Sequence, residues 1–503
     1  MQPGGPKGPS FPYFRRTTEV LMMVAISAVL LIPCVWQKRI QAGDLSSHVY
    51  NAWLAGQIQR GAVKGLTVIP LWTNVLSDWV LERLVYNTGP VAAERIVAGS
   101  AVLIFFWGAF LAVGAAAGRK PWLFCPLLGM LSYGLIFHFG FLNFYLSTGF
   151  CLWILGLLWR PSSKRALASV PLALLALLAH ALPVIWVSSV LAYLYTVRRI
   201  PMPWRMAAPL GGAALLAVLQ SILMNRYPYR WSLQETVLGL TGMDQIWLYD
   251  IKYLILAVAI LIVLLVLLLE RIDQGGLLSD PAGQIWILHA VALVLMPSAI
   301  HLPQYQHPLA YITERISLFT VLFFIIMVGR ARHGRGITRF TGLVTMVFFA
   351  CLYLDGLAFN RVESEVASLV EKLPPGQRLV AAISDSGARL NALLHVADRT
   401  CIGRCFSYGN YEPATGQFRI VITSPNQVVA KDMTVVQEIE EGQHIVTQSE
   451  DPLYSVCGTE GEPGRFYIRQ IHAGERTCAF SQPISVRLGL EHWLSTLSMN
   501  TVN

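Results

Sequence analysis

Long apolar runs recur through the first 360 residues of the chain, separated by short stretches that carry polar and basic residues. A transmembrane α-helix needs about 20 consecutive, mostly apolar residues, and eleven runs approach or reach that length. The pattern predicts an α-helical polytopic membrane protein with about eleven spans. The predicted spans are residues 19–36, 91–117, 122–138, 142–159, 166–180, 182–197, 205–224, 252–269, 284–299, 314–329 and 339–358.

Several of these spans are short. The pair on either side of His180-Ala181-Leu182-Pro183 must turn within the membrane or at its edge. Broken helices leave backbone polar groups unpaired, which a membrane tolerates only where they are buried in protein or line a wet cavity. We therefore expect the short pairs to pack inside the protein or around a cavity.

The composition agrees with a membrane protein. Hydrophobic residues make up 54% of the 503 residues, charged residues only 13%, and the mean hydropathy is +0.52, whereas soluble domains contain about 25% charged residues. The first apolar run is longer than the apolar core of a secretion signal, and no small-residue cleavage site follows it. It is expected to remain as a helix.

Basic residues are distributed unevenly. Residues 360–503 hold 12 Lys/Arg and 16 Asp/Glu, a net charge of −4, which leaves 26 Lys/Arg and 13 Asp/Glu, or +13, for residues 1–359. If the N-terminus is cytoplasmic, nearly every basic cluster between spans lies on the cytoplasmic side, as the positive-inside rule requires. The loops 37–90 and 225–250 and the tail after residue 360 then lie outside. This rule accounts for the basic residues, and no nucleic-acid partner is expected.

The tail has the composition of a small soluble domain. Strand-like runs occur at residues 378–383, 418–423, 434–439 and 465–471, and residues 387–397 could form a helix between strands. We therefore predict a cytoplasmic tail at 1–18, a transmembrane domain at 19–359 with amphipathic helices in its outer loop 37–90, and a small extracytoplasmic α/β domain at 360–503.

The eight cysteines divide evenly between apolar segments and the tail. Cys401, Cys405, Cys457 and Cys478 lie in the tail, where four cysteines outside the cytoplasm suggest two disulfides in one of three connectivities. A zinc site is the alternative, but the spacing contains no paired C-x2-C signature. Disulfides, and hence an oxidising compartment, are favoured.

A polar stripe follows the first predicted span. If a helix begins at Asp44, then Asp44, His48 and Asn51 fall at i, i+4 and i+7 and share one face. Trp53 and Leu54 give the same segment an apolar side suited to the membrane surface. A helix N-cap is the structural alternative for Asp44, but it explains only one residue of the stripe.

A second segment of the same loop, residues 70–79, is also amphipathic and carries Asp78. Elsewhere, His138 and Asn143 lie in apolar surroundings, and Arg226 and Arg230 alternate with aromatic residues in the second outer loop. Glu314 and Arg315 begin an apolar run, where ionisable groups are costly unless they are paired or functional. The candidate substrate-binding residues are His48, Asn51, Asp78, His138, Asn143, His180, Arg226, Arg230, His307, Glu314 and Arg315.

The chain resembles the C-type (GT-C) glycosyltransferases, multispanning enzymes that use polyprenyl-phosphate-linked sugars. The resemblance rests on an acid early in the first outer loop (Asp44), amphipathic helices in that loop, about a dozen spans with short broken pairs and a soluble domain after the last span. Through Gly140-Phe141-Leu142-Asn143-Phe144 and the His180 segment, the chain also resembles bacterial membrane proteins described as related to 6-pyruvoyl-tetrahydropterin synthase.

The resemblance implies that Asp44 is the general base of an inverting sugar transfer at the outer face of a bacterial inner membrane. The acceptor would be a glycan, a lipid or a protein. Some family members hold a divalent metal with two acids separated by one residue, but Asp44 is followed by Leu45-Ser46. No metal and no other cofactor are therefore expected.

Two other functions remain open. A transporter or flippase for lipid-linked or small polar substrates would use the broken helices as its pathway, although such folds often contain internal repeats and none is recognisable. An assembly or sensor protein without catalysis would not bring Asp44, His48 and Asn51 together at a cavity.

Overall fold

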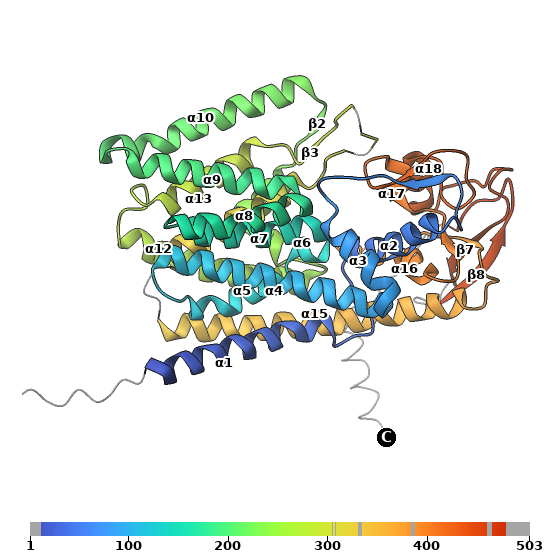
Figure 1. Ribbon diagram of the computed structural model, residues 1–503, viewed down its shortest axis with the longest axis horizontal. Helices are drawn as coiled ribbons and strands as arrows, with labels where there is room; N and C mark the ends of the chain where they lie inside the picture. Colours follow the sequence, from blue (N-terminus) through green and yellow to red (C-terminus); the bar gives the residue numbers. More distant parts are fainter. Residues whose placement is uncertain are drawn as a thin grey trace, which may run out of the picture.

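The computed structural model describes residues 12–303, 305–306, 308–329, 334–383, 388–459 and 465–478. A bundle of helices forms one end of the molecule, and a region of short helices and strands built mainly from residues after 370 forms the other (Figure 1). His307, one of the candidate residues, lies outside the described residues.

Each of the eleven predicted spans is helical over most of its length, although 122–138 is broken after Ser132 and 284–299 leaves the helix after Leu295. Six helices in the described part of the chain are long and apolar enough to cross a membrane, in the ranges Thr17–Cys34, Pro90–Ala117, Ala181–Arg199, Met202–Arg226, Ile251–Asp273 and Gly336–Val370. The others are shorter. The molecule is thus compatible with a multi-pass membrane protein, while the number of eleven crossings stays a prediction.

The bundle contains the following elements in chain order: α1 (Pro12–Leu31), η1 (Ile32–Cys34), α4 (Pro90–Ala117), η2 (Trp122–Phe124), α5 (Cys125–Ser132), α6 (Leu135–His138), α7 (Leu142–Leu158), α8 (Ser163–Ala179), α9 (Ala181–Arg199), α10 (Met202–Arg226), α11 (Leu233–Thr241), η3 (Met243–Gln245), α12 (Ile251–Asp273), α13 (Pro281–Leu295), α14 (Ile312–Val328) and α15 (Arg335–Val370).

Small residues let the central helices α4 and α7 approach closely. A Cβ atom on Gly108 would lie 2.6 Å from the carbonyl oxygen of Gly149, and one on Gly149 would lie 3.0 Å from the amide nitrogen of Phe105. Only glycine permits such backbone contact, and membrane helices commonly use it for packing. These two helices form the buried centre of the bundle.

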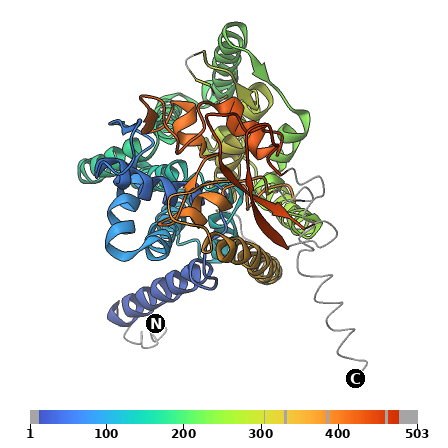
Figure 2. The ribbon, with the colours of Figure 1, turned by 90° about the vertical axis from the view of Figure 1, so that its right-hand side faces the viewer.

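Helix α15 links the bundle to the C-terminal region. It runs without a break across residue 360. Its middle contacts the segment that follows α1, where Trp36 packs against Phe349 and Tyr353, and its last part lies under the C-terminal strands (Figure 1). The predicted boundary between the two domains therefore falls inside a helix. Figure 2 views the molecule from the end that carries the C-terminal region, which lies in front of the bundle.

The C-terminal region contains a four-stranded sheet in the order β5-β4-β7-β8. Strand β4 (Arg378–Ala381) is parallel to β5 (Phe406–Ser407) and β7 (Leu453–Gly458), and β7 is antiparallel to β8 (Phe466–Ile471). A further strand, β6 (Ile420–Ile422), pairs outside this sheet. Three of the four predicted strands are thus confirmed, and a mixed α/β region is present.

The fourth predicted strand is wrong. Residues 434–439 belong to helix α18 (Met433–Glu440), because the Asp432 side chain caps its first turn by accepting from the Val435 amide at 3.1 Å. Val435, Val436 and Ile439 then lie on one buried side of that helix. The helix predicted at 387–397 is also displaced, and the observed helix is α16 (Val396–Cys401).

The segment 37–90, predicted to be the first outer loop, is held against the C-terminal region. It contains α2 (Leu45–Gln59), β1 (Leu66–Val68) and α3 (Leu76–Thr88), and β1 pairs antiparallel with β6, with Leu66 opposite Ile422. Helix α2 is buried over most of its length, so the expectation that it lies along a membrane surface is wrong. Only α3 and the segment before it expose large apolar side chains, such as Trp72 and Trp79.

A second pair of short strands joins two loops of the bundle. Strand β2 (Tyr229–Arg230) is antiparallel to β3 (Ala299–Ile300), which joins the loop after α10 to the loop after α13. The short helix α17 (Tyr411–Thr415) completes the fold and faces α2.

Candidate active site

Two glycines set the position of Asp44. Gly43 has φ +35°, and a Cβ atom there would lie 2.5 Å from the carbonyl oxygen of Phe139. Gly140 has φ +77°, and its Cβ atom would lie 2.6 Å from the amide nitrogen of Asp44. The loop before α2 therefore rests directly on the backbone of the α6–α7 turn, where the Asp44 amide donates to the Phe139 carbonyl oxygen at 3.0 Å.

Asp44 precedes α2 but does not cap it with its side chain, so the helix-cap interpretation of its carboxylate is wrong. Its Oδ1 atom lies 3.3 Å from Nε2 of His395, in the C-terminal region. The other ring nitrogen of His395 lies 3.3 Å from Oδ2 of Asp398, and the Ser407 hydroxyl donates to the same carboxylate. A chain of polar contacts thus leads from Asp44 into the C-terminal region.

The next residue of the stripe, His48, faces two buried carboxylates. Its Nδ1 atom lies 2.8 Å from Oδ1 of Asp78 on α3 and 3.9 Å from Oε1 of Glu412 on α17. The Asn143 side chain of α7 donates to Oδ2 of Asp78 at 2.8 Å and accepts from the Ser77 amide at 2.9 Å. Helices α2, α3 and α7 and the C-terminal region therefore meet around the His48–Asp78 pair.

The last residue of the stripe, Asn51, is paired with Asn410, whose amide nitrogen lies 2.6 Å from the Asn51 side-chain oxygen. Asp44, His48 and Asn51 thus share one face, and all three contact residues between 395 and 412. The stripe faces the C-terminal region.

The charges in this cluster shift one another's pKa values. Burial alone would lower the pKa of His48, but the Asp78 carboxylate outweighs it and raises the pKa to about 9. Burial also opposes the charge on His395, yet its contacts with Asp398 and Asp44 raise its pKa to about 10. Burial and the neighbouring charge of Asp78 raise the pKa of Glu412 to about 7. The charge of Arg419 opposes this rise and also acts on Asp78. The site therefore combines several buried acids with the cations His48, His395 and Arg419.

Arg315 on α14 supplies a cation near Asp44, with which its charge interacts. Its guanidinium lies 4.8 Å from the ring centre of Phe141 and 5.5 Å from that of Phe144, and Nη1 donates to the Ala310 carbonyl oxygen. Its buried Nε atom has no hydrogen-bond partner in the part of the chain that the structure describes. Arg315 is thus held by aromatic rings and keeps a free donor.

Other candidates play local structural roles. His180 caps α9, since its Nδ1 atom accepts from the Leu182 amide at 3.1 Å. His138 contacts the Gln41 carbonyl oxygen and the Tyr249 hydroxyl, both at 3.1 Å. Within the described residues, neither histidine forms a hydrogen bond or an ion pair with the Asp44 carboxylate.

The remaining candidates lie around the site or away from it. Glu314 is buried, and its Oε2 atom lacks a hydrogen-bond partner among the described residues. Arg230 is largely exposed and pairs with Glu235 at 3.2 Å, and Arg226 is exposed at the end of α10. Arg226 and Arg230 therefore do not join the buried cluster.

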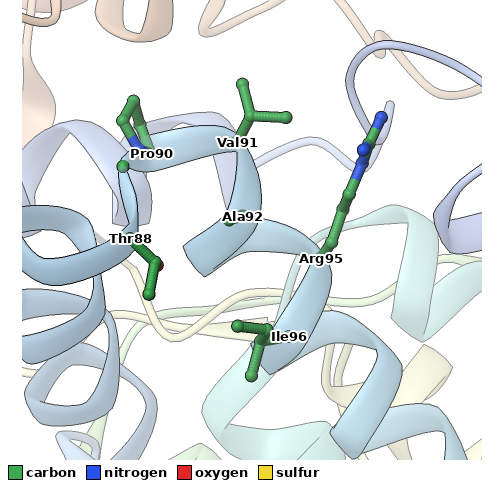
Figure 3. A pocket seen from close by; sticks show the side chains of 7 residues that line it. Thr88, Pro90, Val91, Ala92, Arg95 and Ile96 are labelled. Carbon is green, nitrogen blue, oxygen red and sulfur yellow. The ribbon is translucent and has the colours of Figure 1, made fainter.

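A surface depression among the described residues lies away from this cluster. It measures about 470 Å³ at the turn between α3 and α4 and is lined by Thr88, Gly89, Pro90, Val91, Ala92, Arg95 and Ile96 (Figure 3). Its one ionisable side chain, Arg95, already donates to the Gln37 carbonyl oxygen at 2.9 Å. The depression offers no acid or base for chemistry.

Only one group of side chains within the described ranges has the geometry of a metal site. The donor atoms of His48, Asp78 and Glu412 all lie within 4.8 Å of one another, and all three residues are buried. The four tail cysteines are not available as ligands, because Cys401 is bonded to Cys405 and Cys457 to Cys478. The predicted disulfides are confirmed.

Protein-family models, curated proteins and solved structures yield no match to this chain. The candidate function therefore rests on the geometry of the site and on the sequence.

Sequence reasoning did not identify the partners that the C-terminal region supplies. His395, Asp398 and Glu412 lie in a segment whose composition is that of an ordinary soluble domain. The sequence did hold one indication of a site, because a histidine and several acids lie close to Cys401 and Cys405. The disulfide between these two cysteines restricts the conformation of that segment.

Proposed function

We propose that the protein is a membrane glycosyltransferase that moves a sugar from a polyprenyl-phosphate-linked donor to an acceptor hydroxyl, with inversion and with Asp44 as general base. The observation that carries the proposal is the exposure of Asp44. Its side chain is 26% exposed, whereas the side chains of Asp78, Asp398 and Glu412 are at most 7% exposed. Asp44 is the acid of this cluster that a substrate can reach.

The contacts of Asp44 suit proton abstraction. His395 holds the Oδ1 atom, and Oδ2 has no hydrogen bond from the described residues. A general base must come within hydrogen-bond reach of the proton that it removes. An acceptor hydroxyl bound at Oδ2 would be oriented by a carboxylate whose position is set by the Phe139 backbone and by His395.

Arg315 suits the donor side of the reaction. A sugar on a polyprenyl phosphate needs little activation beyond stabilisation of the phosphate that departs. A guanidinium binds phosphate oxygens through paired N–H donors. Arg315 has a buried Nε without a hydrogen-bond partner among the described residues, and its charge interacts with that of Asp44. We assign the phosphate to Arg315 and the acceptor to Asp44.

The location of the cluster favours transfer over transport. Helices α2 and α3 lie at the end of the bundle, against the C-terminal region (Figure 1). A transporter would be expected to bind its substrate near the middle of the membrane. In this proposal the site faces the outer side of a bacterial inner membrane, and the C-terminal region helps to bind the acceptor.

The test is a turnover measurement on purified full-length protein in lipid vesicles, with a panel of polyprenyl-phosphate hexoses and pentoses. Mass spectrometry would quantify released polyprenyl phosphate. We expect Asp44→Asn to lower turnover about 10²–10⁴-fold, the usual effect of removing a general base. Asp432→Asn is the matched control, because Asp432 also directly precedes a helix, α18, and has a 37% exposed side chain.

Wild-type turnover in Asp44→Asn would exclude this role for Asp44. Movement of the donor across the vesicle membrane without release of polyprenyl phosphate would instead favour a flippase.

A further inference from the structure

Three side chains from three separate helices converge at the inner side of the Asp44 cluster. His48 belongs to α2, Asp78 to α3 and Glu412 to α17, and their donor atoms lie within 4.8 Å of one another. Zinc binds histidine nitrogen and carboxylate oxygen ligands at about 2.0–2.2 Å. A single ion can therefore contact all three donor atoms with little movement of the side chains.

One of the three, Glu412, is buried without a hydrogen bond to its carboxylate, although the charges of His48 and Arg419 act on it. The Glu412 side chain is 3% exposed, and its Oε1 atom lies 3.9 Å from Nδ1 of His48, which is beyond hydrogen-bond distance. No donor in the described part of the chain makes a hydrogen bond with this carboxylate. Burial of an ionised group without partners is costly, and such groups in proteins are usually paired or bind metal ions. The Glu412 carboxylate is therefore able to accept a further donor or to bind a cation.

The surroundings orient the ligands as they do in known metal sites. The second carboxylate oxygen of Asp78, Oδ2, accepts a hydrogen bond from the Asn143 side-chain amide at 2.8 Å. The Asn143 side-chain oxygen accepts in turn from the Ser77 backbone amide at 2.9 Å. Outer contacts of this kind hold a ligating carboxylate in place, and their removal typically weakens metal affinity 10–100-fold. Asp78 therefore presents Oδ1 to His48 and to the proposed ion.

We propose that His48, Asp78 and Glu412 form a binding site for one divalent transition-metal ion, shared between the first outer loop and the C-terminal region. One imidazole nitrogen and two carboxylates suit Zn²⁺ or Mn²⁺ better than Mg²⁺, which prefers oxygen ligands alone. Three protein ligands also leave a coordination position open, as in catalytic zinc sites. The inference departs from the expectation of a metal-free site, which rested on the Leu45-Ser46 spacing after Asp44.

A different occupant of the same space is a proton. In that case His48 is an imidazolium that pairs with Asp78 and Glu412, and no ion binds. The two arrangements make opposite predictions for metal binding, because a metal-bound imidazole nitrogen cannot carry a proton.

The experiment measures metal binding to the full-length protein without any sugar donor. After treatment with a chelator and removal of the chelator, the protein is titrated with Zn²⁺ and then with Mn²⁺, and bound metal and the melting temperature are recorded. We expect one equivalent of metal per chain and a rise in melting temperature on binding. Glu412→Gln, which preserves the shape of the side chain, should lower the affinity at least 100-fold, and Asn143→Ala should lower it 10–100-fold.

Glu450→Gln is the matched control. Glu450 also faces a histidine, with its Oε2 atom 3.0 Å from Nε2 of His444, but its carboxylate accepts hydrogen bonds from Thr447 and Tyr408. This variant should bind metal as the wild type does.

Two results would overturn the proposal: a wild-type protein that binds less than 0.1 equivalent, or a Glu412→Gln variant with unchanged affinity. Failure of the glycosyltransferase proposal is separate, because a protein that binds the ion but turns over no donor would retain this site and lose only the assigned reaction.

Discussion

The Nε2 atom of His395 lies 3.3 Å from Oδ1 of Asp44, although one residue belongs to the C-terminal region and the other directly precedes α2. Because Asp398 contacts the opposite ring nitrogen, the imidazole is held between two carboxylates. The C-terminal region therefore contributes directly to the environment of the proposed base.

The position of His395 predicts a pH-dependent contribution to stability. Its contacts with Asp398 and Asp44 outweigh burial and raise its pKa from an ordinary value of 6.5 to about 10. A group with a raised pKa stabilises the folded state fully below its unfolded value and loses that contribution as the pH rises through the folded value. The stability gained from His395 should therefore decrease between about pH 6.5 and pH 10.

The measurement compares thermal unfolding of the wild type and His395→Gln at a series of pH values. We expect the wild type to be more stable by about 1–3 kcal/mol near pH 6, with the difference shrinking toward pH 10. A difference that is constant or that grows with pH would rule out a charged His395 between the two acids.

Gly140 and Gly403 provide a matched pair for testing how Asp44 is positioned. Both have φ +77°, so alanine pays a similar backbone cost of about 1 kcal/mol at either site. A Cβ atom on Gly140 would lie 2.5 Å from the Leu45 amide nitrogen, whereas one on Gly403 would have nothing within 4 Å. Gly140→Ala should thus lose stability beyond this cost and lower turnover, and Gly403→Ala should retain turnover. Equal effects on turnover would show that the close contact does not position Asp44.

Arg399 is expected to hold the C-terminal region on the bundle. Its guanidinium lies 3.0 Å from Glu94 on α4 and 2.6 Å from Glu363 on α15, and all three side chains are buried. Removal of one partner from a buried ion pair typically costs about 3–5 kcal/mol. Arg399→Met should therefore destabilise the protein strongly and speed proteolysis of the C-terminal region.

The control for Arg399 is Arg230→Met, because Arg230 forms an ion pair with Glu235 while its side chain remains 72% exposed. Exposed pairs contribute about 0–1 kcal/mol. Denaturant unfolding would measure the free energy of unfolding of both variants. Similar decreases in the two variants would contradict the proposal that Arg399 holds the C-terminal region on the bundle.

The two disulfides should differ in their contribution to stability. Cys401–Cys405 closes a loop with a sequence separation of 4, and Cys457–Cys478 closes one with a separation of 21. Because loop-closure entropy grows with loop length, the chain-entropy relation assigns about 2 kcal/mol to the first and about 3 kcal/mol to the second. Double Cys→Ser variants would be compared by thermal unfolding, and peptide mapping without reductant should recover these two linkages and no others. A larger loss from the shorter loop, or a different linkage, would contradict this assignment.

Much of the fold was predictable because its signals are local. Apolar runs of membrane length predicted helices at eleven segments, and all eleven are helical over most of their length. The failure at α18 has a physical cause: its β-branched residues resemble a strand, while the cap at Asp432 and the buried face of Val435, Val436 and Ile439 favour a helix.

The candidate site was predictable only in part. The 3.6-residue period placed Asp44, His48 and Asn51 on one face, and Asp78, Asn143 and Arg315 were recognised as polar residues in unusual surroundings. Their partners His395 and Glu412 reach the site only through tertiary packing, including the pairing of β1 with β6. No local pattern in a single sequence reports such contacts between distant segments.

The central claim, a lipid-phosphate site beside Asp44, is tested most directly by cryo-electron microscopy of the full-length protein with bound polyprenyl phosphate. We predict that density for the phosphate contacts the Arg315 guanidinium and lies beside the Asp44 carboxylate, with the lipid chain directed toward the helical bundle. Density for the phosphate at a place that contacts neither Arg315 nor the Asp44 cluster would contradict the account.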